Sequence, residues 1–131
     1  MPSIFSRIVA GEIPCYRIAE TDDFLAFLDV NPNAKGHTLC IPKIESDKIF
    51  ELEEDTYMAL MRFSRKVAQA IEKVIPCKRV GMAVVGLEVP HVHVHLIPLN
   101  HMDEFRFQQK VSFDAAAFEE IAASIRHALA Q

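Results

Sequence analysis

Hydrophobic and polar positions in the first third of the chain predict a short helix followed by three strands. Gly11 ends the helical pattern, because glycine adopts the left-handed conformation that often follows a helix. Asp22 and Asp23 separate two β-rich runs, which indicates a hairpin turn. The predicted elements are a helical turn over residues 4–10 and strands over residues 16–20, 24–29 and 37–42.

Further along, apolar residues recur with a 3.6-residue period over residues 52–75, which predicts a long helix. Two more β-rich runs follow, at 80–85 and 91–97, and a last helix begins near Asp114. The apolar stripe of this last helix consists of Phe118, Ile121, Ile125 and Leu129. Strands with short connections and a segregated helix predict an α+β domain: a mainly antiparallel five-stranded sheet with one long helix and a C-terminal helix.

Composition narrows the class of protein. The 131 residues suffice for one domain, and half of them are hydrophobic, as in globular chains. The net charge of −4 gives no field that attracts duplex nucleic acid, so an anionic ligand would need local contacts. The three cysteines form no CxxC pair, and there is no signal-peptide pattern and no apolar run of about 20 residues. We therefore expect a cytoplasmic protein without a membrane partner.

The stretch EVPHVHVHLIPLN contains His91, His93 and His95 at every second position. Side chains on a strand alternate between faces, so the three imidazoles share one face and the apolar residues between them take the other. A metal ion shared by the three rings would account for this pattern. However, the first and last Cα atoms would lie about 13 Å apart on a straight strand, whereas metal–nitrogen bonds are about 2 Å long.

A structural role and a catalytic role fit the same pattern. The histidines can be polar core residues, although each buried nitrogen without a partner would cost about 1–3 kcal/mol. They can also be catalytic, because a neutral imidazole is a nucleophile near pH 7 and neighbouring imidazoles can donate protons to a phosphate-like transition state. The residues alone leave metal binding, structure and catalysis open.

The same stretch resembles the signature of the histidine triad (HIT) family, His-φ-His-φ-His-φ-φ, where φ is apolar. The run IFSRIVAGEIPCYRIAETDDFLAFLDVNPNAKGHTLCIPK is similar to the N-terminal half of its Hint-like nucleotide-binding branch. The resemblance implies a HIT-like fold and a single HIT domain over residues 1–131. Residues 1–100 are then the family-like core, and residues 101–131 a divergent C-terminal extension with a helix.

The resemblance also implies an activity. Family members bind nucleotides and cleave nucleoside monophosphates from phosphoramidates or dinucleoside polyphosphates, through a nucleotidyl-histidine intermediate. By position, His93 matches the nucleophile, and His95 matches the residue that contacts phosphate and assists the leaving group. The backbone carbonyl of His91 would orient the nucleophilic ring, and His37 would support the triad through hydrogen bonds.

A nucleoside site is implied by the same match. Asp29 corresponds to the acidic residue that binds the ribose hydroxyls, for which a carboxylate is a good acceptor. The apolar positions around the base are Phe5, Ile8, Ile13, Phe27, Val30 and Leu39. From the residues alone, ordinary core packing explains the apolar set, and a strand-end turn explains Asp29.

Three positions around the phosphate depart from the family pattern. Leu87 stands where a glutamine is usual, Glu88 where a hydroxyl residue binds phosphate, and Leu99 where an arginine is common. Losing one transition-state donor can cost a factor of about 10² to 10³. Two functions therefore stay open: a nucleotidyl hydrolase or transferase, and a nucleotide-binding or scaffold protein with weak or lost catalysis.

This chemistry requires no cofactor, and no metal site is expected, although a polyphosphate substrate can arrive as its Mg²⁺ complex. The expected small-molecule partner is a nucleoside monophosphate or a nucleotide conjugate. The resemblance implies a homodimer that pairs through the long helix and an edge strand.

Overall fold

The structure is a computed structural model that describes residues 2–131. Its helices are α1 (Ile4–Val9), α2 (Glu54–Val74) and α3 (Ala115–Leu129), with the short 3-10 helices η1 (Ile49–Glu51) and η2 (Met102–Phe105). Its strands are β1 (Arg17–Glu20), β2 (Phe24–Leu28), β3 (Thr38–Pro42), β4 (Arg79–Ala83) and β5 (Val94–Leu99).

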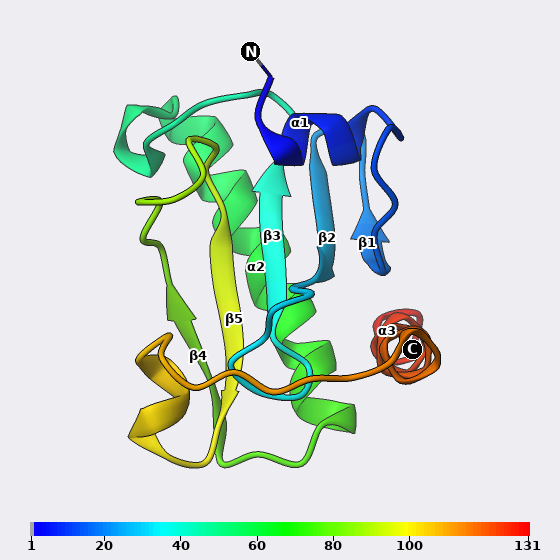
Figure 1. Ribbon diagram of the computed structural model, residues 1–131. Coiled ribbons are helices and arrows are strands. Elements are labelled where there is room, and N and C mark those ends of the chain that lie inside the picture. Colours follow the sequence, from blue (N-terminus) through cyan, green and yellow to red (C-terminus); the bar gives the residue numbers. More distant parts are fainter. Residues whose placement is uncertain (1) are drawn as a thin grey trace.

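The five strands form one antiparallel sheet in the order β1-β2-β3-β5-β4. The long helix α2 runs behind this sheet, whereas α1 lies across the upper end of the front face (Figure 1). The C-terminal helix α3 packs against β1 and α2 (Figure 1). The predicted α+β fold, with a five-stranded antiparallel sheet, one long helix and a C-terminal helix, is confirmed.

The main core lies between the sheet and α2. Leu60, Val67 and Ile71 form the buried side of α2, as the 3.6-residue period predicts. On β5, Val94 and Leu96 are fully buried in the same core. Because side chains alternate along a strand, His95, which lies between these two, faces the front of the sheet.

The last predicted strand begins three residues later than expected, at Val94. Ahead of it, the N–H of Val92 donates to the carbonyl of Ser46, in the connection between β3 and α2, rather than to a neighbouring strand. His91 and His93 therefore lie in an extended segment before β5. The two-residue alternation continues through this segment, because Val92 is buried in the same core as Val94.

His37, predicted as the first residue of the strand over 37–42, lies just before the observed β3. Its N–H bonds to the carbonyl of Ala34 at 3.1 Å, which closes a turn in which Gly36 takes a left-handed conformation with φ of 91°. The fourth strand is likewise displaced from the predicted 80–85, because Val84 and Val85 continue past the paired residues and are exposed.

The C-terminal helix begins where the sequence predicts. The Asp114 side chain caps it by accepting from the N–H of Ala117 at 2.8 Å. Its predicted stripe is buried at Phe118, Ile121 and Ile125, and Phe118 stacks on the Tyr16 ring at 5.0 Å. The predicted fourth member of the stripe, at position 129, is only partly buried.

Among residues 2–131, none of the helices has both the length and the apolar character needed to cross a bilayer.

Truncating Leu60 tests the main core. Leu60 has no exposed surface, so Leu60→Ala should lower the free energy of unfolding by about 2–5 kcal/mol through lost burial and a residual cavity. Urea denaturation followed by circular dichroism measures the change. Leu87 is 89% exposed, and Leu87→Ala should stay within about 0.5 kcal/mol of the parent. Equal losses in both variants would contradict this assignment of the core.

Candidate active site

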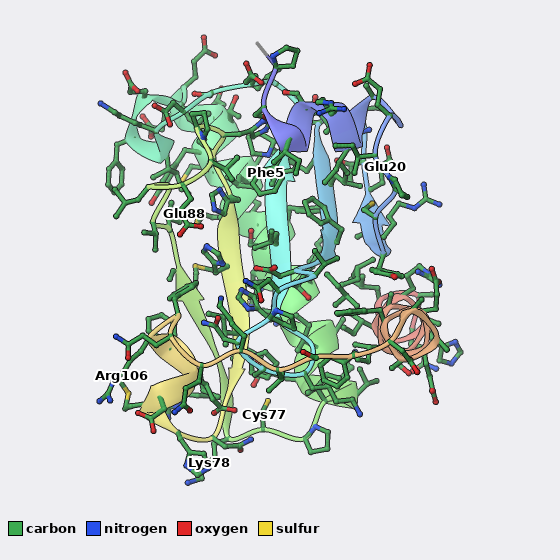
Figure 2. The ribbon with its side chains drawn as sticks, in the orientation of Figure 1. Phe5, Glu20, Cys77, Lys78, Glu88 and Arg106 are labelled. Atoms are coloured by element: carbon green, nitrogen blue, oxygen red, sulfur yellow. The ribbon has the colours of Figure 1, made fainter. Side chains whose placement is uncertain are left out.

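Four histidines gather on the front of the sheet, away from α2. Two of them have no exposed surface and two are 7% exposed. The Phe5 ring on α1 approaches one end of this group, and the Phe107 ring on the segment after η2 approaches the other. Figure 2 shows Phe5 reaching from α1 toward β3 and β5. The four residues are His37, His91, His93 and His95.

The ring of His93 is held in one orientation by the backbone. Its Nδ1 donates to the carbonyl oxygen of His91 at 2.7 Å, since a carbonyl can only accept. In the neutral ring the hydrogen is therefore on Nδ1, and Nε2 keeps its lone pair. The Phe5 ring lies edge-on to His93 at 4.9 Å and restricts the ring from the other side. This arrangement presents one imidazole nitrogen as a nucleophile.

A chain of hydrogen bonds places the hydrogen of His95 on Nε2, whereas that of His93 is on Nδ1. The backbone N–H of Asn33 donates to Nδ1 of His37 at 2.9 Å, so the hydrogen of the neutral His37 ring is on Nε2. That Nε2 donates to Nδ1 of His95 at 3.0 Å. The hydrogen of His95 must then be on its own Nε2. His95 is consequently a hydrogen-bond donor, whereas His93 is an acceptor.

His91 is tied to three separate parts of the chain. Its Nε2 donates to the carbonyl of Pro42 at 2.8 Å, and its Nδ1 accepts from the Ser3 hydroxyl at 2.7 Å. The carboxylate of Glu45 accepts from the Ser3 backbone N–H and from the Ser6 hydroxyl. These contacts hold the His91 backbone, and therefore the carbonyl that orients His93.

Burial keeps the rings of His37, His91 and His95 neutral at physiological pH. Burial, followed by the neighbouring His95 and Lys110, lowers the pKa of His37 to about 3. Burial, followed by His93 and Lys110, lowers the pKa of His95 to about 4. The pKa of His91 is also lowered, mainly by burial. Neutral rings are required for the hydrogen-bond directions described above.

The structure brings together only part of the predicted apolar set. Phe5, Phe27 and Leu39 are buried in a small cluster on the front face, and Ile8 packs against it. The other two predicted positions are outside this cluster: Ile13 is half-buried in the turn after α1, and Val30 is 67% exposed. Ile13 and Val30 are accessible to a ligand, but they do not extend the apolar cluster in this structure.

Asp29 follows β2 and lies beside the histidines. Its Oδ1 accepts from the N–H of Asn31 at 2.8 Å, and its Oδ2 is 3.6 Å from Nε2 of His37. Burial raises the pKa of Asp29, and the Glu88 carboxylate adds a smaller effect in the same direction. Glu88 itself is exposed on the loop between β4 and β5 (Figure 2).

Among residues 2–131, one group of three possible ligands is close enough to share a metal ion. It consists of Asp29, His37 and His95, whose ligand atoms lie within 4.8 Å of one another. The hydrogen bonds oppose coordination. Nε2 of His37 carries a hydrogen and offers no lone pair, and Nδ1 of His95 already accepts that hydrogen. The donors are arranged for a hydrogen-bond relay.

Several contact residues were not found by sequence reasoning. Ser3 and Glu45 act on His91, and Asn33 and Lys110 lie around His37. Only Asn33 had a local signal, because the Asn-Pro-Asn run marks a turn, but nothing in that signal indicates which ring its amide contacts. Their partners lie far away in sequence, in most cases by more than forty residues.

The low pKa values predict a pH dependence of stability. In the unfolded chain a histidine titrates near 6.5, whereas His37 should titrate near 3 and His95 near 4 in the folded protein. Between these limits the unfolded state binds more protons, so the free energy of unfolding should fall as the pH drops from about 6.5. NMR titration of the ring carbons gives the pKa values directly. His37→Gln should reduce the slope, and titration of His37 near pH 6.5 would contradict the burial argument.

Known proteins share both the sequence and the fold. A family model described as the HIT domain matches residues 10–102. The adenosine 5'-monophosphoramidase hnt1 of Schizosaccharomyces pombe is 41% identical over 100 residues, which cover 75% of this chain and 74% of that protein. An uncharacterized HIT-like protein of Borreliella burgdorferi is 31% identical over 131 residues, 93% of this chain and 94% of that one.

Two solved structures superpose on nearly the whole chain. A Zn-bound histidine triad family protein from Mycobacterium smegmatis has a TM-score of 0.84 and 28% identity, and the match covers 98% of this chain and 93% of that one. A hypothetical histidine triad nucleotide-binding protein from Sulfolobus tokodaii has a TM-score of 0.81 and 28% identity, over 96% and 91%. With the family model spanning most of the sequence and the triad arranged on one face, the chain belongs to the HIT family.

Proposed function

We propose that this chain is a nucleotide-binding hydrolase or transferase. It would cleave a nucleoside monophosphate from phosphoramidates or dinucleoside polyphosphates through a nucleotidyl-histidine intermediate. The observation that carries the proposal is the hydrogen bond from Nδ1 of His93 to the His91 carbonyl. It leaves the lone pair on Nε2 of a ring that is already oriented for attack.

In the first step, Nε2 of His93 attacks the α-phosphorus of the bound nucleotide. The bond from phosphorus to the leaving nitrogen or oxygen breaks, and its electron pair goes to the leaving group. A leaving nitrogen also takes up a proton from solvent, so that it departs as ammonia or an amine. The product is a nucleotidyl group bonded to Nε2, with Nδ1–H still donating to the His91 carbonyl. This hydrogen bond becomes charge-assisted in the adduct, because the substituted ring is a cation.

His95 would assist through its Nε2–H. This group can donate to a phosphate oxygen or to the leaving atom, where negative charge develops. In the second step, water attacks phosphorus, the electron pair of the phosphorus–nitrogen bond returns to Nε2 of His93, and the water proton passes to solvent. An acceptor alcohol or phosphate in place of water would make the same reaction a transfer.

The nucleoside would lie between α1 and the end of β2. Phe5, Phe27 and Leu39 offer an apolar surface next to His93, and the Asp29 carboxylate can accept from two ribose hydroxyls. The Mycobacterium smegmatis neighbour is described as Zn-bound, but the Asp29, His37 and His95 donors of this chain do not fit an ion, so no step here uses one.

The alternative proposal is a nucleotide-binding or scaffold HIT protein with weak or lost catalysis. It is favoured by the surroundings of the triad, where Leu87 is 89% exposed and Glu88 adds a negative charge. Leu99, the third departure, lies at the end of β5 paired with Arg79 of β4 and offers no phosphate donor. Micromolar binding of AMP without product formation would support this alternative.

Replacing the nucleophile tests the leading proposal. His93→Ala should lower turnover of adenosine 5'-phosphoramidate and diadenosine tetraphosphate by at least about 1,000-fold, because no other group supplies the attacking lone pair. Acid-quenched reactions with radiolabelled substrate should show an AMP adduct in the parent protein and none in the variant.

The matched control is His127→Ala, which removes an exposed histidine from α3. It should leave both turnover and adduct unchanged. Full activity in His93→Ala would refute the assignment of the nucleophile, whereas an inactive parent that binds AMP would favour the binding protein.

We also propose that the chain forms a homodimer through β4 and α2. β4 is an edge strand of the sheet, and Met82 on it is 46% exposed. Val84 and Val85, which follow β4, are exposed as well. Met82→Lys should shift the protein toward monomer in sedimentation equilibrium, while Met102→Lys, at an exposed methionine of η2, should not. A parent protein that stays monomeric at high concentration would contradict the proposal.

A further inference from the structure

The segment over residues 105–113, here called the tail strap, crosses the front of the sheet below the histidines. It runs from η2, in front of the lower end of β5 and of the loop between β2 and β3, toward α3 (Figure 1). The N–H of Val111 donates to the carbonyl of Pro32 at 3.0 Å, which attaches the strap to that loop. The strap therefore borders the site at the end opposite α1.

Phe107 joins the tail strap to the histidines. Its ring lies edge-on to His95 at 4.8 Å and to His37 at 6.1 Å. Its backbone φ is 60°, the left-handed region, which costs a non-glycine residue on the order of 1 kcal/mol. The ring contacts offset this strain, so the strap is held in a defined position beside His95.

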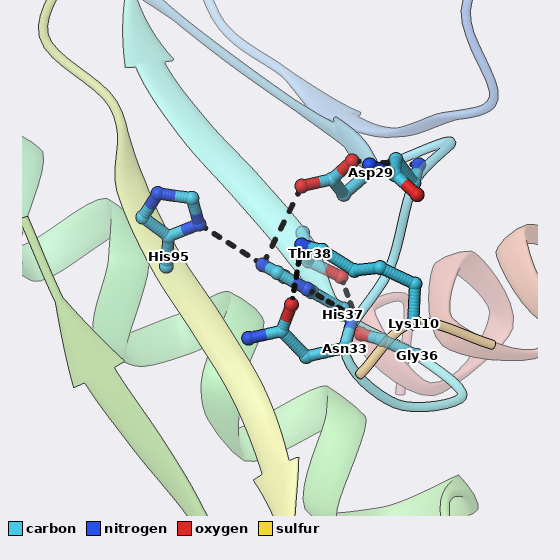
Figure 3. A network of polar contacts seen from close by, with 8 residues as sticks. Asp29, Asn33, Gly36, His37, Thr38, His95 and Lys110 are labelled. Carbon is cyan, nitrogen blue, oxygen red and sulfur yellow. Dashed lines mark hydrogen bonds and ion pairs between the residues drawn. The ribbon is translucent and has the colours of Figure 1, made fainter. Parts of the chain in front are cut away.

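Lys110 places an ammonium group next to the same pair of rings. Its Nζ donates to Oδ1 of Asn33 at 2.6 Å and lies 5.2 Å from the centre of the Phe107 ring. Asn33 is the residue whose backbone N–H fixes the tautomer of His37. Figure 3 shows Lys110, Asn33 and His37 in one polar network with Asp29 and His95.

Lys110 is close enough to the Asp29 carboxylate to lower its pKa, but it does not form an ion pair with it. No ion pair within residues 2–131 includes Lys110, and its hydrogen-bond partner is a neutral amide. Because Lys110 contributes to the lowered pKa values of both His37 and His95, its field reaches the triad. The side chain is exposed, so an anion can reach it from solvent.

The bond to Lys110 also leaves Asn33 with an unused donor. An ammonium can only donate, so Oδ1 of Asn33 must face Lys110 and Nδ2 must face away. Asn33 is 4% exposed, and its Nδ2 has no hydrogen-bond partner in this part of the chain. A buried donor without a partner costs about 1–3 kcal/mol. The Lys110–Asn33 hydrogen bond therefore forms even though it leaves Nδ2 of Asn33 without a partner.

The tautomers of His37 and His95 determine which leaving groups the site can assist. His95 can donate a hydrogen bond from Nε2, but giving up that proton would leave an imidazolate, because Nδ1 accepts from His37 and carries none. His37 cannot replace the proton, because its own Nδ1 accepts from the Asn33 amide. A leaving group that needs no proton, and whose charge meets a nearby cation, is best suited to this site.

Resting on the proposed function, we propose that Lys110 binds the leaving group and makes the chain selective for nucleotide conjugates whose leaving group is a phosphate anion. His93 Nε2 forms its bond to the α-phosphorus while the bond from phosphorus to the bridging oxygen breaks. The electron pair goes to that oxygen, which departs as a phosphate beside Lys110 and the Nε2–H of His95. No net proton transfer is required in this step.

Two substrates with the same AMP half separate this role from a general one. Diadenosine tetraphosphate releases ATP, whose terminal phosphate is the leaving anion, whereas adenosine 5'-phosphoramidate releases ammonia, which needs a proton. Lys110→Met should lower kcat/KM for the tetraphosphate about tenfold more than for the phosphoramidate, as expected for one lost charge-assisted hydrogen bond. Lys110→Arg should restore most of the difference, and high ionic strength should reduce it.

Arg106→Met is the matched control, because Arg106 is a cation on the same strap that is already paired with Asp103 at 2.8 Å. It should leave the ratio of the two kcat/KM values unchanged. Equal losses for both substrates in Lys110→Met would mean that Lys110 acts only by holding Asn33 and His37. That outcome, or no loss for either substrate, would overturn the proposal.

Comparing the binding of ADP and AMP tests the role of Lys110 even if the protein turns over neither substrate. In metal-free buffer, calorimetry should show that the parent protein binds ADP more tightly than AMP, because the second phosphate occupies the place of the leaving group. Lys110→Met should bring the two dissociation constants together. If the parent turns over neither substrate, the proposed function fails but this ratio still tests Lys110, and a ratio unchanged by Lys110→Met would refute its role.

Discussion

Buried imidazoles need a partner for each ring nitrogen, and this requirement organises the front face of the sheet. An amide N–H or a hydroxyl supplies a donor, and a backbone carbonyl supplies an acceptor. The Asn33 amide acts on His37, the Ser3 hydroxyl on His91, and the His91 carbonyl on His93. Together they leave one free lone pair, on His93, next to one free N–H, on His95. The chemical difference between two identical side chains comes from the backbone around them.

The two faces of the sheet carry different kinds of residue, because successive side chains of a strand point to opposite faces. On the rear face, Val92, Val94 and Leu96 join the core with α2, which provides most of the buried apolar surface. This burial holds the β5 segment rigidly, and rigid support is what positions the imidazoles at fixed separations. On the front face, α1 and the tail strap cover the histidines from two sides, and the exclusion of water lowers the pKa values of His37 and His95. The residues that stabilise the fold and the imidazoles therefore lie on opposite faces of the same strands.

Charge around the triad is set by few groups. Asp29 and Glu88 contribute negative charge beside the proposed phosphate site, and Lys110 is the cation whose field lowers the pKa values of His37 and His95. Relatives in the HIT family include proteins named for phosphoramidate cleavage. Phe107 and Lys110, which border the proposed place of the leaving group, come from the tail strap, beyond the residues 10–102 that the family model matches.

The sequence by itself determined the fold class, the long helix and the common face of His91, His93 and His95. These follow from two-residue and 3.6-residue periods, which are local properties of the chain. It also identified the family through the triad and the first forty residues. Strand ends were less accurate, because the N–H of His37 bonds within its own turn, to Ala34, and the N–H of Val92 bonds to Ser46 in a loop, rather than to a neighbouring strand. Only the tertiary structure decided the tautomers, the separation of Ile13 and Val30 from the apolar cluster, and the approach of Lys110 to Asn33, 77 positions away. Such contacts depend on which loops the folded sheet brings together, and the periodicity of the sequence does not show which distant residues will be close in space.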